Sequence, residues 1–509
     1  EANTQNSIPY ATIVVIDSDG KTSGTVTTDD GSFEFTTTIG DKKIVISCIG
    51  YIRYMTERKI MGSVDLGEVL LQPDTKLLSE VVVKSSKPIV RREIDKLVVD
   101  AKSLSLISSN AIDLLKRTPG LLVSEEGNIS VIGKGKLIVL VNGRESHMTE
   151  QELTAYLKSM QSQEIERIEV MTTPPSKYSA EGDAGVVNIV EQKKISDYLG
   201  GTLTDQHYAS KGHANDISGS LKYQKGKLFL YANTSLGLGN QKKENFQDRR
   251  YSGKNWEQIS CIKNSNKYGS GDIGFEWILS KHFNLGGHYS ILSFYPNREI
   301  REKVNAIENT NNSTYSFLST DNIARKMLRH NGALFLIKNW DDNKSAAFDI
   351  NYIHLNMGED EQYQATGDNH FRYNNKFDRT THLLITKFDV EIPTKKFKID
   401  FGSSYQYTLT KNDASYLDNP ALPDQYDKFR YREQIVAAYA DFMFRPFPKT
   451  ISKIGLRSEV TFMNGNQINN DEKTARKLLH FFPTFFFNYN PHKNHVLSFS
   501  YGSRITRPT

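Results

Sequence analysis

Three stretches within residues 111–190 decide the fold: AIDLLKRTPG (111–120), LIVLVNGR (137–144), and EIERIEVM (164–171) followed by GDAGVVNIV (182–190). The first predicts a short amphipathic helix that ends before Pro119-Gly120, because proline and glycine cannot continue it. The second predicts a strand that enters a tight hairpin at Asn142-Gly143, where the turn requires positive φ angles. The remaining segments predict two strands. On these facts alone the stretch is a small α+β domain.

In this order, the motifs resemble the plug domain of TonB-dependent outer-membrane transporters. That family carries a PGV turn, an INGR hairpin, an IERIEV strand and a GxGGVINI strand, which correspond here to PGL (119–121), VNGR (141–144), IERIEV (165–170) and DAGVVNI (183–189). Leu121 replaces the usual valine, and only one of the paired glycines is present. The resemblance implies that the following are plug-motif residues: Pro119, Gly120, Asn142, Gly143, Arg144, Arg167, Glu169, Gly182, Gly185 and Asn188.

Length and composition limit the class of protein. The 509 residues predict several domains, and the interleaved charges, with a formal net charge of +5, do not indicate a nucleic-acid partner. The mean hydropathy is −0.51, and no apolar run approaches the roughly 18 residues of a membrane helix. A β-barrel remains compatible with this hydropathy because its lumen is polar, and 25 Tyr and 26 Phe suit its strands and girdles.

Residues 1–72 predict a small β-sandwich, with strands at 9–16, 22–28, 32–35, 41–49 and 64–71 separated by Asp-Gly turns. This part resembles the carboxypeptidase-regulatory-like domain that precedes the plug in many Bacteroidetes transporters. It contains no nucleophile, metal cluster or catalytic base, so we predict no peptidase activity. The chain starts at Glu1 without a visible signal peptide, and we expect it to be processed or trimmed at its front.

Residues 73–90 predict a polar linker with one β-prone island. The island is either one more strand of the first domain or, as the resemblance implies, the TonB box, an extended segment that adds itself to the sheet of a periplasmic partner. It consists of Leu78, Ser79, Glu80, Val81, Val82, Val83 and Lys84.

The resemblance places the plug at residues 91–193, where residues 152–160 predict a helix, and a transmembrane β-barrel at 194–509. Apolar and polar residues alternate along strands of about ten residues or more, as spanning strands require. Short turns, such as 225–226, 341–343 and 394–396, alternate along the chain with polar stretches that predict long loops: 240–258, 308–322, 412–427 and 465–476. We expect a mainly β protein with about 13 barrel strands. Since the family's barrel has 22, we expect the C-terminal part to be missing.

The other motifs in the sequence do not indicate a catalytic, cofactor or metal site. GSGDIG (269–274) fits a dinucleotide-binding pattern, but the residues after it predict a strand where that site needs a helix. Cys48 and Cys261 lie far apart, and the twelve histidines are scattered, so we predict no metal site, no cofactor and no enzyme activity. The charged cluster Glu164, Glu166, Arg167 and Glu169 either seats the plug against the barrel wall or is an ordinary exposed strand face.

The predicted function is TonB-dependent active import of a scarce ligand across the Gram-negative outer membrane, with the N-terminal domain in the periplasm. Ligand would bind above the plug and be released when TonB pulls. The cargo could be an iron chelate, a peptide or a glycan; the absence of Gly-Tyr-Gly after residues 81–83 disfavours a glycan. The expected partners are TonB with its inner-membrane motor, outer-membrane lipid, and a surface lipoprotein or other outer-membrane protein. The alternative is a structural or assembly subunit of an outer-membrane complex that retains the transporter fold.

Overall fold

The computed structural model describes residues 1–2, 4, 6–19, 21–48, 51–73, 90–124, 127–182, 184–192, 197–251, 254–308, 313–368, 370–420, 423–492 and 495–505. The chain divides into two compact units, Glu1–Pro88 and Ile89–Thr509, and each is described by itself. Within the described residues, no helix is both long enough and apolar enough to cross a membrane.

The first unit is built on one four-stranded antiparallel sheet with the order β2-β1-β3-β4. Its strands are β1 (Thr12–Asp17), β2 (Thr22–Val26), β3 (Gly40–Ser47) and β4 (Tyr54–Ile60). One face carries the core, formed by Ile13, Val15, Ile44, Ile46 and Leu71. Alternation in β1 and β3 puts Ile13, Val15, Ile44 and Ile46 on one side, because successive residues of a strand point to opposite faces.

Two of the predicted strands of the first domain are not formed. Residues 32–35 and 64–71 are not strands in the described structure, but Phe33, Phe35, Leu66 and Val69 pack against the core of the single sheet. Apolar alternation reports which side chains are buried, but it does not report whether the backbone pairs with a neighbour. The edge strand β4 was not predicted, since its side chains are mostly exposed and give no alternation.

The second unit contains an α+β domain, residues 90–192, which we call the plug. Its six-stranded sheet has the order β10-β9-β12-β11-β6-β5. The strands are β5 (Val90–Arg92), β6 (Leu97–Asp100), β9 (Lys136–Val141), β10 (Arg144–Glu145), β11 (Ile165–Met171) and β12 (Ala184–Glu191). Strands β9 and β12 are parallel, whereas β11 is antiparallel to β12 and to β6. A separate pair joins β7 (Leu121–Val123) to β8 (Ile129–Val131).

The plug helices pack on this sheet. They are α2 (Ala101–Ser105), α3 (Ala111–Lys116), α4 (Glu150–Ser159) and the 3₁₀ turn η1 (Ser162–Glu164). Helix α3, confirmed where it was predicted, buries Ile112, Leu114 and Leu115 in the core. Helix α4 starts two residues before its predicted position because Thr149 and Glu152 form a capping box at its N-terminus.

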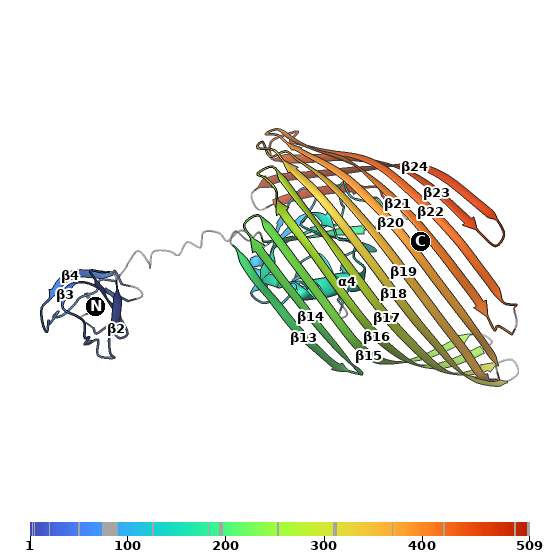
Figure 1. Ribbon diagram of the computed structural model, residues 1–509, viewed down its shortest axis with the longest axis horizontal. Coiled ribbons are helices and arrows are strands. Elements are labelled where there is room, and N and C mark those ends of the chain that lie inside the picture. The colour runs from blue at the N-terminus through green and yellow to red at the C-terminus, as the bar shows by residue number, and fades with distance from the viewer. Residues whose placement is uncertain are drawn as a thin grey trace. The chain divides into compact units, whose positions relative to one another are not determined.

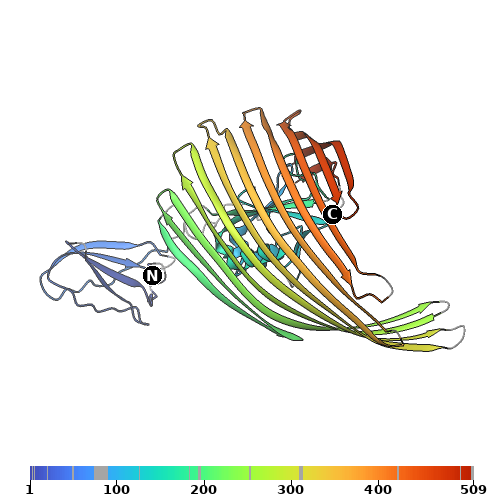
Figure 2. The same ribbon diagram turned by 45° about the vertical axis from the view of Figure 1, so that its right-hand side comes forward.

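Thirteen antiparallel strands, β13 to β25, form one curved sheet in strict sequence order, which we call the wall. The plug lies in the hollow of this sheet (Figures 1 and 2). The predicted strand number is thereby confirmed, and within the described residues β13 and β25 do not pair with each other. The bounds are β13 (Tyr198–Ser210), β14 (Gly212–Lys225), β15 (Leu228–Tyr251), β16 (Lys254–Ile278), β17 (Phe283–Glu308), β18 (Thr314–Asn339), β19 (Ser345–Gly367), β20 (Phe371–Pro393), β21 (Phe397–Leu417), β22 (Gln425–Phe444), β23 (Thr450–Gln467), β24 (Glu472–His492) and β25 (His495–Gly502).

The short turns are confirmed, but the long polar loops are wrong. Most residues of the predicted loop 240–258 belong to β15 and β16, whose ladder continues to the pair Tyr251↔Lys254. The other three predicted loops are likewise largely strand. Polar side chains do not prevent strand pairing in water, because the backbone ladder is satisfied while both faces remain hydrated. The polar stretches are therefore extensions of the wall strands.

The two faces of the wall differ as the alternation predicted. On β18, Leu334 and Leu336 are exposed on the outer face, whereas Arg329, Asn331 and Phe335 are buried on the inner face. The same alternation recurs on the neighbouring strands, where Phe348 and Ile350 of β19 point outward. An apolar outer face and a polar inner face are what a membrane-spanning wall requires.

Candidate functional site

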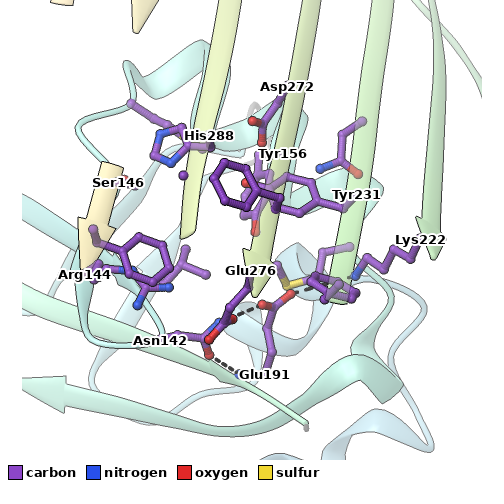
Figure 3. Close-up of a pocket in the computed structure, with 18 of the residues that line it drawn as sticks. Asn142, Arg144, Ser146, Tyr156, Glu191, Lys222, Tyr231, Asp272, Glu276 and His288 are labelled. Carbon is purple, nitrogen blue, oxygen red and sulfur yellow. Dashed lines mark hydrogen bonds and ion pairs between the residues drawn. The ribbon is translucent and has the colours of Figure 1, made fainter. Parts of the chain in front are cut away.

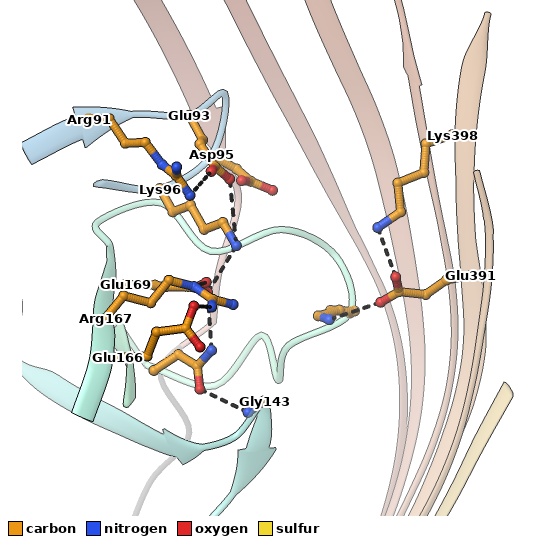
Figure 4. A network of polar contacts seen from close by, with 12 residues as sticks. Arg91, Glu93, Asp95, Lys96, Gly143, Glu166, Arg167, Glu169, Glu391 and Lys398 are labelled. Carbon is orange, nitrogen blue, oxygen red and sulfur yellow. Dashed lines mark hydrogen bonds and ion pairs between the residues drawn. The ribbon is translucent and has the colours of Figure 1, made fainter. Parts of the chain in front are cut away.

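The plug motifs converge on one buried carboxylate, that of Glu169 on β11 (Figure 4). It accepts hydrogen bonds from Lys96 Nζ at 2.9 Å, Arg167 Nε at 2.9 Å and Asn188 Nδ2 at 3.0 Å. Burial by itself raises the pKa of Glu169, but the charge of Lys96 and the hydrogen bond from Asn188 outweigh it and hold the pKa below its ordinary value. Glu169 is therefore ionised and fully engaged at neutral pH.

Asparagine side chains link this carboxylate to the hairpin turn. The Oδ1 atom of Asn188 accepts from the backbone N–H of Gly143 at 2.9 Å. Asn142 donates to Glu191 through its amide at 2.8 Å and accepts from the Glu191 backbone at 2.9 Å. Both turn residues have positive φ, 52° for Asn142 and 82° for Gly143, as predicted. The three motifs that are separate in sequence thus form a single polar network between β9, β11 and β12.

The proline and glycine residues of the motifs allow backbone conformations and close contacts that other residues would hinder. Pro119 follows the end of α3, and Gly120 has a φ of +89°. Gly185 lies so close to Val131 that an added Cβ would meet its side chain at 2.5 Å. The N–H of Gly182 donates to the carbonyl of Ile505, which follows the last strand of the wall, at 2.6 Å. These positions shape the plug and do not present chemistry to a ligand.

Ion pairs join the plug to the wall. Glu152 of α4 pairs with Arg329 of β18, and both side chains are almost fully buried. Asp95, in the β5–β6 hairpin, pairs with Lys453 of β23 at 2.8 Å. Although burial raises the pKa of Asp95, the positive charge of Lys453 lowers it below its usual range.

Four further ion pairs lie between plug and wall. Lys222 of β14 lies 2.6 Å from Glu164 and 3.8 Å from Glu191. Two pairs have the charges reversed: Lys158–Asp216 at 3.2 Å and Lys177–Glu391 at 3.7 Å. The predicted charged cluster is accordingly divided between the two readings. Glu164 contacts the wall, whereas Glu166, Arg167 and Glu169 bond within the plug.

A small cavity with a mixed polar and apolar lining lies at the same boundary (Figure 3). Asn142, Arg144 and Tyr156 of the plug face Tyr231 and Asp272 of the wall across it. The guanidinium carbon of Arg144 stacks 3.5 Å from the ring centre of Phe335. The cavity measures about 100 Å³, well under the several hundred Å³ of a typical ligand pocket. The cavity is therefore too small for a bulky ligand.

A larger hollow lies among the wall strands β14 to β18 and measures about 1110 Å³. It is polar, and its charged lining residues are Lys211, Lys242, Lys263, Arg298, Glu244 and Glu299. Four cations against two carboxylates make it basic. Its volume is that of a site for a small molecule or chelate.

Two further predictions concern the TonB box and the lack of a metal site. The island Leu78–Lys84 lies outside the described residues, so its role stays a prediction. No group of three or more His, Cys, Asp or Glu that could hold a metal occurs in the part of the chain that the structure describes.

The structure also brings in residues that the sequence reasoning missed. Lys96, Asp95, Arg329 and Lys453 carry the polar contacts of the plug, but they lie in ordinary-looking segments. The available signal was weak: Arg329 and Lys453 are charged residues at inward positions of otherwise alternating strands. Their partners are far away in sequence, so the pairing could not be read.

Comparison with known proteins supports this architecture. Residues 338–509 match the sequence model of the family described as "Outer membrane protein beta-barrel family". Residues 338–509 are part of an outer-membrane β-barrel. The match, together with the thirteen-stranded sheet, places the wall in the outer membrane. Residues 1–83 match the CarboxypepD_reg-like domain, as the resemblance implied.

Solved structures with a similar outline are outer-membrane receptors. They include the ferric yersiniabactin uptake receptor FyuA from Yersinia pestis, with 10% identity, 80% of this chain and 85% of that chain covered, and a TM-score of 0.34. The siderophore receptor PiuA from Acinetobacter baumannii has 10% identity, coverage of 80% and 79%, and a TM-score of 0.32. The ferric-catecholate import receptor Fiu from E. coli K12 has 9% identity, coverage of 80% and 85%, and a TM-score of 0.28. No curated protein matches the chain.

Proposed function

We propose that the protein imports a scarce ligand across the outer membrane in a TonB-dependent manner. The observation that carries the proposal is an α+β plug seated by ion pairs in the hollow of an outer-membrane β-sheet. A wall that only anchored or stiffened the membrane would need no separable domain inside it. The polar boundary supports movement of the plug, since water hydrates both partners of each ion pair once they separate, and this hydration offsets much of the interaction that is lost.

The order of elements suggests how force would enter the plug. Residues 78–84 precede β5, which is the edge strand of the plug sheet and pairs with β6 through only three residue pairs. A pull from the periplasm would peel β5 first and then load the Asp95–Lys453 pair. Few ladder bonds at the pulled end favour stepwise opening. The rest of the plug sheet is held by longer ladders.

Binding of TonB tests the partner directly. Full-length protein in detergent micelles would be titrated with the isolated periplasmic C-terminal domain of TonB. Val82→Pro should abolish binding, because proline removes a backbone donor and cannot sit within a paired strand. Ser86→Pro, four residues further along the linker, is the matched control and should bind normally. Equal binding by wild type and Val82→Pro would contradict the assignment of the TonB box.

Uptake in cells tests the function. Deletion of residues 78–84 should abolish uptake while ligand still binds at the cell surface. Persistence of uptake in the deletion strain would refute energy transfer through this segment.

The basic hollow favours an anionic cargo, such as a ferric chelate, among the three predicted classes. Under iron limitation, Lys242→Glu should then slow ferric-chelate uptake, and unchanged uptake would remove this argument.

The second candidate, a structural or assembly subunit, is favoured by the strand extensions. Strands β16 to β18 have 25 or 26 residues, so each is about 85 Å long at roughly 3.3 Å per residue. Crossing the hydrocarbon needs only about 30 Å. Such extensions could hold a partner outside the membrane. Purification from native membranes without added ligand distinguishes the roles: a stoichiometric protein partner supports the structural subunit, whereas isolation alone supports the transporter.

A further inference from the structure

A row of imidazoles crosses three neighbouring strands of the wall. His330 of β18 stands directly opposite His354 of β19, which in turn stands opposite His382 of β20. The ring centres of His330 and His354 are 6.2 Å apart, and those of His354 and His382 are 4.6 Å apart. Nothing in the plug–wall contact uses these side chains. The row therefore needs an explanation of its own.

The row lies on the outer face, at the rim of the apolar band. His354 shares its face with Ile350 and Tyr352, which are exposed, whereas Asn351 and Ile353 between them are buried on the inner face. Beyond His354 the outward positions become polar, beginning with Asn356 and reaching Asp360. Water and lipid headgroups meet a barrel at such a rim, where aromatic girdles form. Ions in solution can thus reach the imidazoles.

Two nitrogen atoms in the row are placed as a chelating pair. The Nδ1 atoms of His354 and His382 are 3.3 Å apart, and the Tyr352 hydroxyl lies 2.8 Å from Nδ1 of His382. Two nitrogens bound to one tetrahedral ion at about 2.0–2.1 Å are separated by roughly 3.3–3.4 Å. The amide of Asn356 holds Nε2 of His354 at 3.1 Å and so fixes the orientation of that ring. In the absence of an ion, one Nδ1–H donates to the other Nδ1.

We propose that His354 and His382 bind a divalent transition-metal ion, of the class of Zn²⁺, Ni²⁺ and Cu²⁺, through their Nδ1 atoms. Neutral imidazole suits these ions, whereas Mg²⁺ and Ca²⁺ prefer oxygen. Binding forms two metal–nitrogen bonds, and the proton shared between the two Nδ1 atoms moves to the Nε2 atom of the ring that carried it, so both imidazoles stay neutral ligands. Water completes the coordination. His330 flanks the pair, with its own Nδ1 held 2.7 Å from the Tyr289 hydroxyl. The site is independent of the proposed import function.

Calorimetric titration with ZnCl₂ tests the site, using the full chain in detergent micelles at pH 7. The tightest binding event should have a stoichiometry of one ion per chain. His354→Ala and His382→Ala should each weaken zinc affinity at least about tenfold, since loss of a residue that only hydrogen-bonds to a metal ligand already costs that much. MgCl₂ should give no such event. His207→Ala is the matched control, because His207 is also stacked on a histidine of the next strand, His213.

The variants are chosen so that misfolding can be recognised. His354→Tyr keeps an aromatic girdle residue but removes the ligand, so it should fold and still lose the tight event. Unchanged zinc affinity in His354→Tyr and His382→Ala, or an equal loss in His207→Ala, would overturn the proposal.

Discussion

A single carboxylate, that of Glu169, organises the plug at the level of residues. It accepts hydrogen bonds from Lys96, Arg167 and Asn188. Asn188 in turn accepts a hydrogen bond from the backbone N–H of Gly143. A buried charge is tolerated only when it is paired and hydrogen-bonded, and each of these partners lies on a different segment. This physical requirement explains why motif residues from 142 to 188 occur together.

Replacement of Glu169 by Gln should destabilise the plug by about 2 kcal/mol at neutral pH, because charged hydrogen bonds become neutral ones. Because its folded pKa lies below the ordinary 4.5, Glu169 stabilises the fold above that value, and the stabilisation is lost as pH falls through the folded pKa. Wild type and variant should therefore converge in acid. Thermal unfolding between pH 3 and pH 7 measures the gap, and a gap independent of pH would contradict the ionised network.

Gly185 offers a second test at one position. Gly185→Ala should cost about 1–3 kcal/mol, because the new methyl meets the buried Val131 at 2.5 Å. Gly135→Ala is the control, since an added Cβ there meets nothing within 4 Å, and it should change the stability by less than about 0.5 kcal/mol. Chemical unfolding followed by plug hydrogen exchange distinguishes them; equal effects would argue against the close packing of β8 on β12.

At the scale of elements, two plug segments are fixed to the wall by buried ion pairs. Helix α4 is held by Glu152–Arg329, and the β5–β6 hairpin by Asp95–Lys453. The Glu152 carboxylate also caps α4 through the Thr149 backbone N–H at 2.8 Å. The start of the helix and its attachment to the wall therefore depend on the same side chain, so loss of the attachment should be felt in α4.

Arg329→Met should destabilise the protein by about 3–5 kcal/mol, because it leaves Glu152 charged and buried without its partner. The double variant Arg329→Met with Glu152→Gln should recover part of this loss by removing the uncompensated charge. Hydrogen exchange in α4 reports the effect locally. An exposed pair, Lys344–Asp342, serves as control, and Lys344→Met should be nearly neutral. Strictly additive effects of the two buried substitutions would show that the residues do not interact.

At the scale of the whole molecule, the wall has an apolar outer band with marked edges. On β18 the band extends along the strand from Leu328 to Lys338. At the Lys338 edge, the ammonium group lies 4.7 Å from the centre of the Trp340 ring. Those eleven or so residues match the length of a spanning strand. The histidine row lies near the opposite edge. Polar strand extensions continue beyond it, so the membrane covers only part of each strand.

Leu334→Arg, in the middle of this band, should destabilise the protein by about 2–4 kcal/mol in lipid vesicles, because arginine is costly at the bilayer midplane. Phe246→Arg is the control: Phe246 is even more exposed, but it lies on the polar extension of β15. Folding titrations in vesicles give both values. A similar cost for the two variants would place the lipid boundary elsewhere.

Much of this protein could be predicted from local sequence, because local rules govern it. Helix α3, the Asn142-Gly143 hairpin, the strand number and the two faces of the wall follow from periodicity and turn chemistry. Two predicted strands of the first domain and the long loops were wrong because burial and backbone pairing are different properties, and the pattern of apolar and polar residues reports only burial. The motif residues were located, but their common role in one network was not.

Only the tertiary structure decided which charges meet. Arg329 and Glu152 are 177 residues apart, and Lys453 and Asp95 are 358 apart. The histidine pair on β19 and β20 likewise depends on register. An ion pair or a chelating pair is a statement about distance in space, and distance between remote segments arises from packing and strand register together. Residue type and spacing state which groups are available; the fold decides which partners each one finds.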